Sequence, residues 1–337
     1  MRILVYEFFS GGGRAGCALP ASLSREGEAM LSAVVCDLAA VEGHHVVTTR
    51  DPRFSFRAPR DVEVIELAKT GRSLGELIAS CDAVWLIAPE TNGCLEDLAR
   101  SVEEQNKTLL SCSSAAIRRA SNKAELHRSM AAAGLAYPAT RALGASCDSV
   151  LLARELGFPV VVKPSTGAGC EGVSVARTPA ELHEALRVVR RSGVRGPIIC
   201  QKYIRGTPAS VSLIADGQRA VSLAVNAQRI VGARPCTYRG GWTPLQHPMA
   251  ARAAEVAEKA CSTFPGLRGF VGVDLVLTKS EVFVIEINPR VTTAYLGVRA
   301  VLGGNMAAMV LDAAEGLMPT PSRPTRKVVT YTCSGVL

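Results

Sequence analysis

The sequence predicts a mixed α/β and α+β protein that begins with an open α/β part. Three observations lead to this prediction. Short apolar runs alternate with helical patterns through the first third of the chain, which is typical of βαβ units in a mostly parallel sheet. A strand-like run ending at Lys163 leads into a glycine-rich stretch. Two later strand-like runs carry the acidic residues Asp274 and Glu286.

Length and composition set the class of protein. A chain of 337 residues indicates two or three domains, and 48% hydrophobic with 20% charged residues is typical of a globular protein. No apolar run reaches the roughly 18 residues of a membrane-spanning helix, and Met1–Tyr6 is too short for a signal-peptide core. The eleven Cys residues form no CxxC pair and no zinc-type cluster, so we expect reduced thiols in a cytoplasmic protein.

The net charge of +8 has two interpretations: a general richness in Arg, or attraction of anionic small molecules such as nucleotides and carboxylates. The basic residues are dispersed, aromatic residues make up only 5%, and no nucleic-acid-binding motif is present. We therefore expect small-molecule substrates, and neither a nucleic-acid nor a membrane partner. A homodimer is left open.

The first third of the chain contains the expected α/β part. After a first strand near residues 3–6, the expected strands are Val46–Thr49, Val62–Leu67, Ala83–Ala88 and Thr108–Cys112, and the expected helices are Ala29–Glu42 and Leu74–Ser80. Ser10–Gly13 resembles a phosphate-cradling turn but lacks the GxGxxG spacing, so a nucleotide site, a substrate loop and a plain loop are alternatives. The small and polar residues of Ala15–Glu28 predict an exposed, mobile loop.

The remaining two thirds contain the expected α+β parts. In the middle we expect a helix, a strand, a glycine-rich loop, a helix and a strand, at Asn122–Gly134, Val160–Lys163, Ser165–Gly172, Pro179–Arg190 and Ile198–Ile204. In the last part the expected strands are Ser210–Ala215, Ala220–Val225, Phe270–Leu277 and Val282–Asn288. A loop is expected over Arg234–Pro248, and helices over Ala250–Thr263 and Thr293–Leu317.

Acidic side chains in the last two strands suggest a metal site. Glu286 and Asn288 are two residues apart, so they project from one face of a strand, and an odd-length turn would place Asp274 on the same face. Two carboxylates and an amide oxygen suit Mg²⁺, and Arg290 could hold a phosphate beside it. The alternative is an ion pair between Glu286 and Arg290, with Asp274 in a turn.

A phosphate site is predicted around Lys163. This Lys ends an apolar strand and precedes the glycines of Ser165–Gly172, which suits phosphate but excludes the GxxxxGK[ST] P-loop. Lys123 is a second candidate phosphate contact, with a solvated helix Lys as the alternative. The strand end Gln201–Ile204 leaves one part of the chain for the next, and free backbone groups at such a hinge favour cofactor binding.

Together these motifs resemble the ATP-grasp superfamily, from about Ser121 to Gly316. In chain order they are Asn122-Lys123, Phe158–Pro164 with the glycine loop, Gln201–Ile204, Asp274 and Glu286–Arg290. The resemblance implies an ATP-grasp fold with an N-terminal open α/β (pre-ATP-grasp) domain. The expected boundaries are 1–114 for this domain, 115–203 for a lid subdomain and 204–337 for a catalytic subdomain.

The resemblance also implies ligands and roles. ATP and Mg²⁺, with Mn²⁺ as an alternative, would lie between the two α+β subdomains. The metal ligands would be Asp274, Glu286 and Asn288, and the catalytic residues Arg290 and Lys163. The nucleotide contacts would be Lys123, Lys163, Ser165, Gly167, Gly169, Gly172, Gln201, Lys202, Tyr203 and Ile204. Many members have acidic residues where this chain has Gln201 and Pro208, which leaves the ribose contact open.

A closer likeness is to the tyramine–glutamate ligase group of methanofuran biosynthesis. It rests on Ile3–Glu7 with Ser10–Gly13, and on Gly206–Ser212, Asn226–Gln228 and Tyr238–Gly241 before Pro244. The likeness implies that the carboxylate of glutamate is activated by ATP and joined to an amine such as tyramine or tyrosine, releasing ADP and phosphate. The candidate acid-substrate contacts are Arg229, Arg234, Tyr238 and Arg239. Another amino-acid or polyglutamate ligase, and a nucleotide-binding protein without turnover, are the alternatives.

Overall fold

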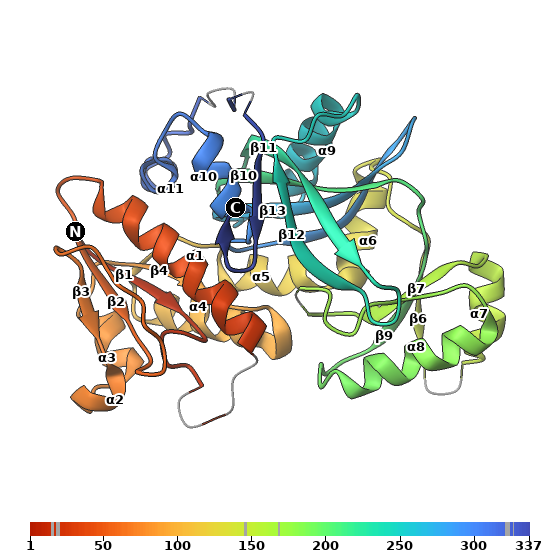
Figure 1. Ribbon diagram of the computed structural model, residues 1–337, viewed down its shortest axis with the longest axis horizontal. Coiled ribbons are helices and arrows are strands. Elements are labelled where there is room, and N and C mark those ends of the chain that lie inside the picture. The colour runs from red at the N-terminus through yellow and green to blue at the C-terminus, as the bar shows by residue number, and fades with distance from the viewer. Residues whose placement is uncertain (15–16, 18–20, 145–146, 168, 321–323, 326) are drawn as a thin grey trace.

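The computed structural model describes residues 1–14, 17, 21–144, 147–167, 169–320, 324–325 and 327–337. Three separate sheets form, of five, four and seven strands, and they follow one another along the chain. Figure 1 shows the five-stranded sheet on the left, the seven-stranded sheet in the centre and the four-stranded sheet on the right. This arrangement confirms the expected combination of one open α/β part and two α+β parts.

The N-terminal sheet is wholly parallel in the order β3-β2-β1-β4-β5. Its strands are β1 (Arg2–Glu7), β2 (His45–Thr49), β3 (Glu63–Ile65), β4 (Ala83–Ile87) and β5 (Thr108–Leu109). The helices are α1 (Ala21–Ala39), α2 (Leu67–Thr70), α3 (Leu74–Ala79), α4 (Cys94–Glu104) and α5 (Ser114–Ser121), with a 3₁₀ turn at Thr91–Gly93. Each strand expected in this part of the chain therefore forms, within the apolar run that predicted it.

One expectation for this part is wrong. Residues 21–28, expected in an exposed loop, form the first two turns of α1, while residues 15, 16 and 18–20 lie outside the described part of the chain. The small and polar residues of 21–28 suit a helix here because this end of α1 packs on the end of β1. The carboxyl group of Glu7 lies where a side chain at Gly27 would stand.

The four-stranded sheet is antiparallel in the order β6-β9-β7-β8. Its strands are β6 (Thr140–Leu143), β7 (Val160–Pro164), β8 (Ser174–Ala176) and β9 (Ile198–Lys202), and its helices are α7 (Ser149–Leu156) and α8 (Pro179–Arg191). The helix α6 (Lys123–Ala132) leads into it. Apolar residues of α7, α8 and the strands form a separate core cluster, so this part of the chain has its own core. We call its four strands the lid sheet, after the lid subdomain expected at 115–203.

The seven-stranded sheet has the order β14-β13-β10-β11-β12-β15-β16. Its strands are β10 (Thr207–Asp216), β11 (Ala220–Val231), β12 (Thr237–Thr243), β13 (Arg268–Leu277), β14 (Val282–Asn288), β15 (Val329–Thr332) and β16 (Gly335–Val336). The strand β12 lies inside the expected loop at 234–248, because Thr237–Thr243 pairs with β11 and β15. The helix α9 (Ala250–Ser262) covers this sheet.

The helical stretch expected over residues 293–317 is two helices, α10 (Ala294–Val301) and α11 (Met306–Ala314). Gly303 and Gly304 lie between them. Asn305 caps α11, because its side-chain oxygen accepts hydrogen bonds from the N–H groups of Ala307 and Ala308. Among the described residues no single helix has the length and hydropathy to cross a membrane; α10 and α11 do so only as a pair, bent by 102°.

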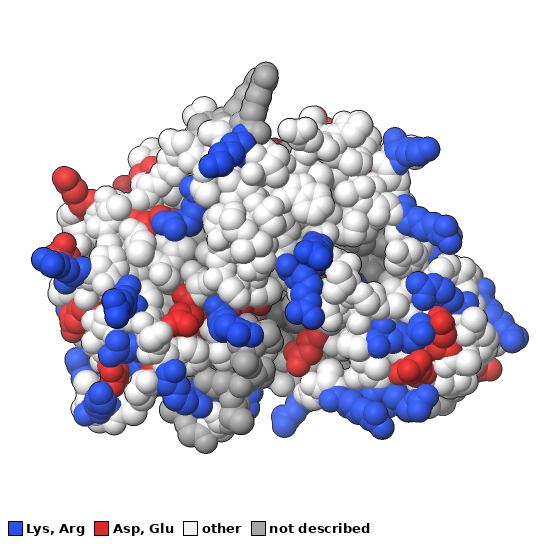
Figure 2. All heavy atoms as spheres, in the orientation of Figure 1, with Lys and Arg blue, Asp and Glu red and all other residues white. Residues whose placement is uncertain are grey.

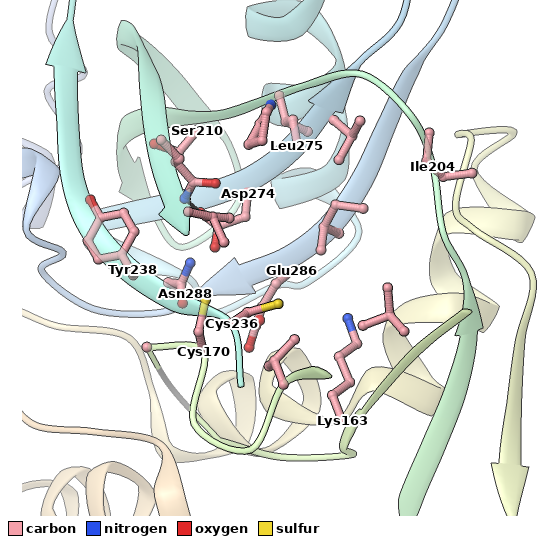
Figure 3. Close-up of a pocket in the computed structure, with 18 of the residues that line it drawn as sticks. Lys163, Cys170, Ile204, Ser210, Cys236, Tyr238, Asp274, Leu275, Glu286 and Asn288 are labelled. Atoms are coloured by element: carbon pink, nitrogen blue, oxygen red, sulfur yellow. Dashed lines mark hydrogen bonds between the residues drawn. The ribbon is translucent and has the colours of Figure 1, made fainter. Parts of the chain in front are cut away.

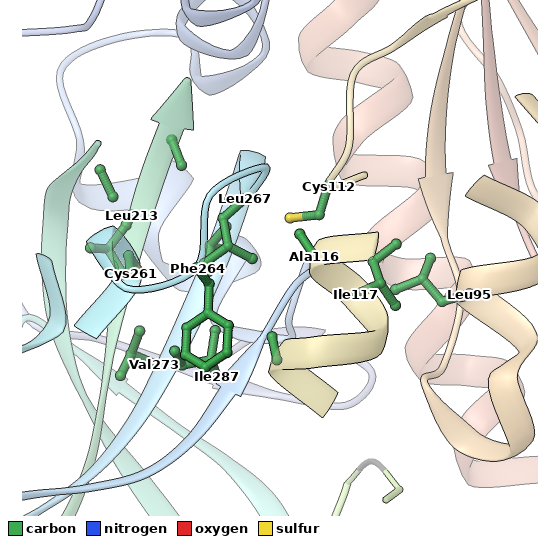
Figure 4. Packing of buried hydrophobic residues seen from close by; sticks show 14 of the residues in the cluster. Leu95, Cys112, Ala116, Ile117, Leu213, Cys261, Phe264, Leu267, Val273 and Ile287 are labelled. Atoms are coloured by element: carbon green, nitrogen blue, oxygen red, sulfur yellow. The ribbon is translucent and has the colours of Figure 1, made fainter. Parts of the chain in front are cut away.

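The N-terminal part packs closely on the seven-stranded sheet. Ile117 and Ala116 of α5 lie in one apolar cluster with Phe264 and Leu267 (Figure 4). Gly269 has a φ of +71°, and a Cβ there would collide with the carbonyl oxygen of Leu110. The two parts therefore share a core, in contrast to the self-contained lid core. The boundaries expected at 114/115 and 203/204 fall at the start of α5 and in the connection from β9 to β10, and they stay predictions.

Figure 2 shows one face of the molecule, on which Lys and Arg side chains are spread among Asp and Glu. On this face the basic residues do not gather into a single patch.

Candidate active site

A cavity of about 320 Å³ lies between the lid sheet and the seven-stranded sheet. The lid contributes Lys163 of β7, and β13 and β14 contribute Asp274, Glu286 and Asn288. Figure 3 shows Lys163 reaching from the lid side and the two carboxylates coming from the sheet opposite. Of the site residues expected from sequence, the cavity wall includes Lys163, Gly169, Gln201, Lys202, Tyr203, Ile204, Asp274, Glu286, Asn288 and Arg290.

One half of this cavity is apolar and ends at the hinge. Its wall contains Val161 and Val175 of the lid and Leu275 and Ile285 of the opposite sheet. Such a slot between two sheets suits a flat aromatic ring. Pro208 also lines it and offers no polar side-chain group.

The hinge leaves one backbone donor free. The N–H of Lys202 donates to the Ala139 carbonyl (2.8 Å), and that of Tyr203 donates to the Pro159 carbonyl (3.1 Å). The N–H of Ile204 donates to no group among the described residues, and Ile204 lines the cavity. We expected free backbone groups across the whole hinge. Of the N–H groups of Lys202, Tyr203 and Ile204, only that of Ile204 is free among the described residues.

Gln201 is bound into the lid. Its side chain is buried, and its amide Nε2 donates to the Thr140 hydroxyl (2.8 Å). A Gln at this position fixes β9 to β6 by a side-chain bond as well as by the backbone ladder.

The register of β13 and β14 brings the two acidic residues together. Asp274 stands directly opposite Glu286, and Asn288 stands opposite Gly272, so all three side chains share a face. The register shifts between Asp274 and Leu275, where β14 carries the extra residue Ile285. This bulge sets both Ile285 and Glu286 in the cavity wall.

The environment of Asp274 fits a cation. Burial, and next the charge of Glu286, raises the pKa of Asp274 to about 7, against lowering contributions from Asn288, Arg290 and Gln228. Gln228 Nε2 donates to Asp274 Oδ1 (2.9 Å), a contact to which sequence reasoning gave no role. Two carboxylates that oppose each other's ionisation, with an amide oxygen beside them, form a hard oxygen donor set of the kind Mg²⁺ prefers. The residues present therefore fit a divalent cation.

Two Lys side chains approach these carboxylates from the lid side. Lys123 Nζ bonds Glu286 Oε1 at 3.0 Å, and both Lys123 and Lys163 are almost fully buried. Burial, and then the positive charge of Lys123, lowers the pKa of Lys163 to about 8. Lys123 has its counter-ion in Glu286, whereas Lys163 forms no ion pair among the described residues, so the space beside Lys163 suits an anionic group such as phosphate.

The glycine-rich loop closes a small adjoining cavity. Its wall includes Lys123, Lys163, Gly167 and Glu171. Ser165 and Gly172 lie outside both walls: the Ser165 N–H donates to the Pro197 carbonyl (2.8 Å), and Gly172 packs on Ser192. Ala168 of this loop lies outside the described residues.

Arg290 is held by a residue from the N-terminal part. Its Nε donates to Glu90 Oε2 (2.9 Å), and its Nη1 donates to the Val291 carbonyl (3.1 Å). Burial opposes the charge of Arg290, but Glu90 outweighs it and raises the pKa. The alternative pairing of Glu286 with Arg290 is thus wrong. Glu90 was not identified from the sequence, although its place just after a buried parallel strand was a usable signal.

The four candidate acid-substrate contacts do not come together. Tyr238 lines the cavity, whereas Arg229 and Arg239 are exposed. Arg234 bonds Glu181 (2.9 Å) and Glu184 (3.0 Å) on the lid helix α8. Arg234 therefore fastens the hairpin between β11 and β12 to the lid.

The same hairpin is joined to the lid through the backbone. The N–H of Val175 donates to the Ala233 carbonyl (2.7 Å), and the N–H of Cys236 donates to the Val173 carbonyl (2.8 Å). The lid also touches the N-terminal part, where the Arg195 N–H donates to Asn92 Oδ1 (3.0 Å). These contacts hold the four-stranded sheet against the hairpin and the N-terminal part.

Comparisons with known proteins agree with this architecture. Residues 120–294, a little over half of the chain, match the ATP-grasp domain family, and residues 44–117 match the pre ATP-grasp 3 domain family. The carbamoyl phosphate synthase large chain of Hyperthermus butylicus is 22% identical over 221 residues, covering 65% of this chain and 20% of that protein. The chain spans about a fifth of the length of the curated relatives it matches.

Three solved structures share the fold. A protein from Archaeoglobus fulgidus described as belonging to the ATP-grasp superfamily is 24% identical, with a TM-score of 0.71 over 98% of this chain and 92% of its own. The biotin carboxylase domain of the Hydrogenobacter thermophilus 2-oxoglutarate carboxylase, solved with MgADP and bicarbonate, is 18% identical (TM-score 0.73, 98% and 73% covered). The L-amino acid ligase of Bacillus licheniformis is also 18% identical (TM-score 0.66, 98% and 78% covered). With the family match and the two facing sheets in agreement, this protein belongs to the ATP-grasp superfamily and carries an N-terminal pre-ATP-grasp domain.

Proposed function

We propose that the protein is an ADP-forming ligase that joins a carboxylate to an amine through an acyl-phosphate. The observation that carries the proposal is that buried Lys163 faces Asp274 and Glu286 across one cavity, while buried Lys123 bonds Glu286 from the adjoining cavity. Cationic groups on one side of a cavity, here from β7 and α6, and hard oxygen donors on the sheet opposite are what a nucleotide–metal complex requires.

The nucleotide occupies the slot between the sheets in this proposal. Its base lies against Val161, Val175 and Ile285, with the Ile204 N–H as the donor to the ring. Lys163 and Lys123 bind the phosphates. The amides of the glycine loop approach them from the lid, because glycines allow the backbone to come close.

The residues at the reacting end bind and orient the transferred group. Asp274, Glu286 and Asn288 would hold Mg²⁺, which neutralises charge on the phosphates when bound. Arg290, kept in place by Glu90, offers its free Nη2 to the phosphoryl oxygens or to the acid. The closed lid excludes water, which would otherwise hydrolyse an acyl-phosphate.

Glutamate with tyramine or tyrosine is the first substrate pair we propose. It rests on the likeness of the N-terminal loop and of residues 226–241 to the tyramine–glutamate ligases. The structural similarity to an L-amino acid ligase supports the broader alternative of another amino-acid ligase. We further propose that residues 115–203 act as the lid and 204–337 as the catalytic unit.

The test is a screen for ADP release with purified protein and Mg²⁺ over pairs of amino acids and amines, with mass detection of products. We expect ADP, phosphate and an amide. Formation of AMP and pyrophosphate would refute the acyl-phosphate. Turnover with other amino acids but never with glutamate would retain the ligase class and remove the glutamate assignment.

A further inference from the structure

Glu26 is a carboxylate in the cavity wall. It lies on α1, in the N-terminal part, and lines the cavity together with Thr292 and Thr293. Its side chain accepts a hydrogen bond from the Thr293 hydroxyl. No Lys, Arg or His in the described ranges forms an ion pair with Glu26. The Cys333 thiol is its second hydrogen-bond partner, so both of these donors are neutral groups.

The groups around Glu26 do not neutralise it. Burial, and next the charge of Glu26, raises the pKa of Cys333 to about 11, so this thiol stays protonated. Glu26 also contributes to the raised pKa of Glu7, in which burial is the largest cause. Arg290 is near enough for Glu26 to raise its pKa, but its bonds go to Glu90 and to its own neighbour's carbonyl. Arg239 is near enough to lower the pKa of Cys333, but it forms no ion pair with Glu26 in the part of the chain that the structure describes.

The two ends of the cavity thus differ in charge. The lid end presents Lys123 and Lys163, which suit anionic phosphates, while the end at α1 presents Glu26, which forms no ion pair within the described ranges. In a chain with a net charge of +8, an uncompensated carboxylate in a ligand cavity points to a cationic ligand group.

We propose that Glu26 binds the ammonium group of the amine substrate, with Thr293 orienting the carboxylate. The inference rests on the proposed ligase function and narrows its second substrate to an organic primary amine or an amino acid. Bicarbonate and dicarboxylic acids would be repelled from this end of the cavity. Glu26 comes from the N-terminal domain, so that domain would select the amine while the ATP-grasp subdomains activate the acid.

The first test compares a charged and an uncharged nucleophile. Hydroxylamine, which is largely uncharged at neutral pH, traps an acyl-phosphate as a hydroxamate, whereas tyramine enters as an ammonium ion. In Glu26→Gln we expect the ratio of kcat/KM for tyramine to that for hydroxylamine to fall at least about tenfold, through KM, because a charge-assisted bond is lost. Glu28→Gln is the matched control, since it removes a carboxylate of the same helix outside the cavity wall. An unchanged ratio, or the same fall in Glu28→Gln, would overturn the proposal.

The second test does not need turnover. Binding of tyramine and of 4-ethylphenol, which lacks the amino group, is measured by saturation-transfer NMR on the full chain. We expect tyramine to bind Glu26→Gln at least about tenfold more weakly than the wild type, and 4-ethylphenol to bind both alike. Equal tyramine binding, or none by the wild type, would refute the ammonium site. Absence of hydroxamate in the wild type with normal tyramine binding would instead refute the acyl-phosphate.

Discussion

Breaking the ion pair between Glu90 and Arg290 should destabilise the protein far more than breaking a surface pair. The side chains of Arg290 and Glu90 are only 12% and 3% exposed, and Nε lies 2.9 Å from Oε2. Removing one partner of such a pair leaves a buried charge without compensation and costs about 3 kcal/mol or more. We therefore expect Glu90→Gln to be severely destabilising.

Glutamine at position 90 does not replace the lost interaction. Its oxygen can still accept from Arg290 Nε, but its amide nitrogen would occupy the place of Oε1, which has no hydrogen-bond partner in the described structure. The variant would thus leave Arg290 uncompensated and also bury an unsatisfied NH₂ group. At roughly 2 °C per kcal/mol for a chain of this size, a loss of about 3 kcal/mol lowers Tm by about 6 °C.

The assay is calorimetric unfolding of Glu90→Gln, Arg290→Met and the double variant. Glu255→Gln is the control, because Glu255 pairs with Arg252 at a similar 3.0 Å but with side chains 65% and 57% exposed. We expect the control to change Tm by less than about 1 °C. We also expect the double variant to be less destabilised than the sum of the single ones. A shift below 1 °C for Glu90→Gln, or additive single effects, would refute the reasoning.

Three further predictions concern the metal, pH and the lid. Glu286→Gln should keep the fold, as judged by circular dichroism, and lower kcat at least about a hundredfold. The reason is that electrostatic stabilisation of the transition state is large in a site without water. Near-normal turnover would remove Glu286 from the mechanism. Burial raises the pKa of Glu7 to about 7 from 4.5, so the folded protein binds more protons than the unfolded one and the stability from Glu7 falls as pH rises from about 4.5 to 7. Urea unfolding at several pH values should show this fall, and Glu7→Gln should flatten it; identical pH profiles would contradict the assignment. The loop 165–172 should exchange amide hydrogens quickly without nucleotide and slowly with ATP, because it opens for exchange; slow exchange in both states would argue against a lid.

The acidic strands and the buried Lys163 could be located from sequence because each breaks a local rule. Asp274 and Glu286 interrupt apolar runs, and Lys163 ends one, so each needed a partner that a core does not supply. The antiparallel pairing and shared face followed from the two-residue period of a strand. The bulge at Ile285 could not be predicted, because no residue type in this apolar run indicates an extra residue.

Contacts between distant segments lay beyond sequence reasoning. Glu90 and Arg290 are two hundred positions apart, and nothing local in either segment names the other. We expected Arg234 to contact an acid substrate. Its guanidinium instead forms ion pairs with Glu181 and Glu184 of α8. The strand β12 was missed for a similar reason: its Gly and Arg residues favour a loop locally, and only pairing with β11 and β15 makes it a strand.

The contacts between the β11–β12 hairpin and the lid, called the seam here, affect how much ATP would be hydrolysed without product formation. If the lid opens for nucleotide exchange as we propose, the seam's two backbone bonds and the Arg234 ion pairs would break in that movement, since both sheets wall the slot. A weaker seam, as in Arg234→Ala, would speed product escape but admit water to the intermediate more often. Such a variant would release phosphate without making a matching amount of amide, so the seam sets how tightly hydrolysis and synthesis stay coupled.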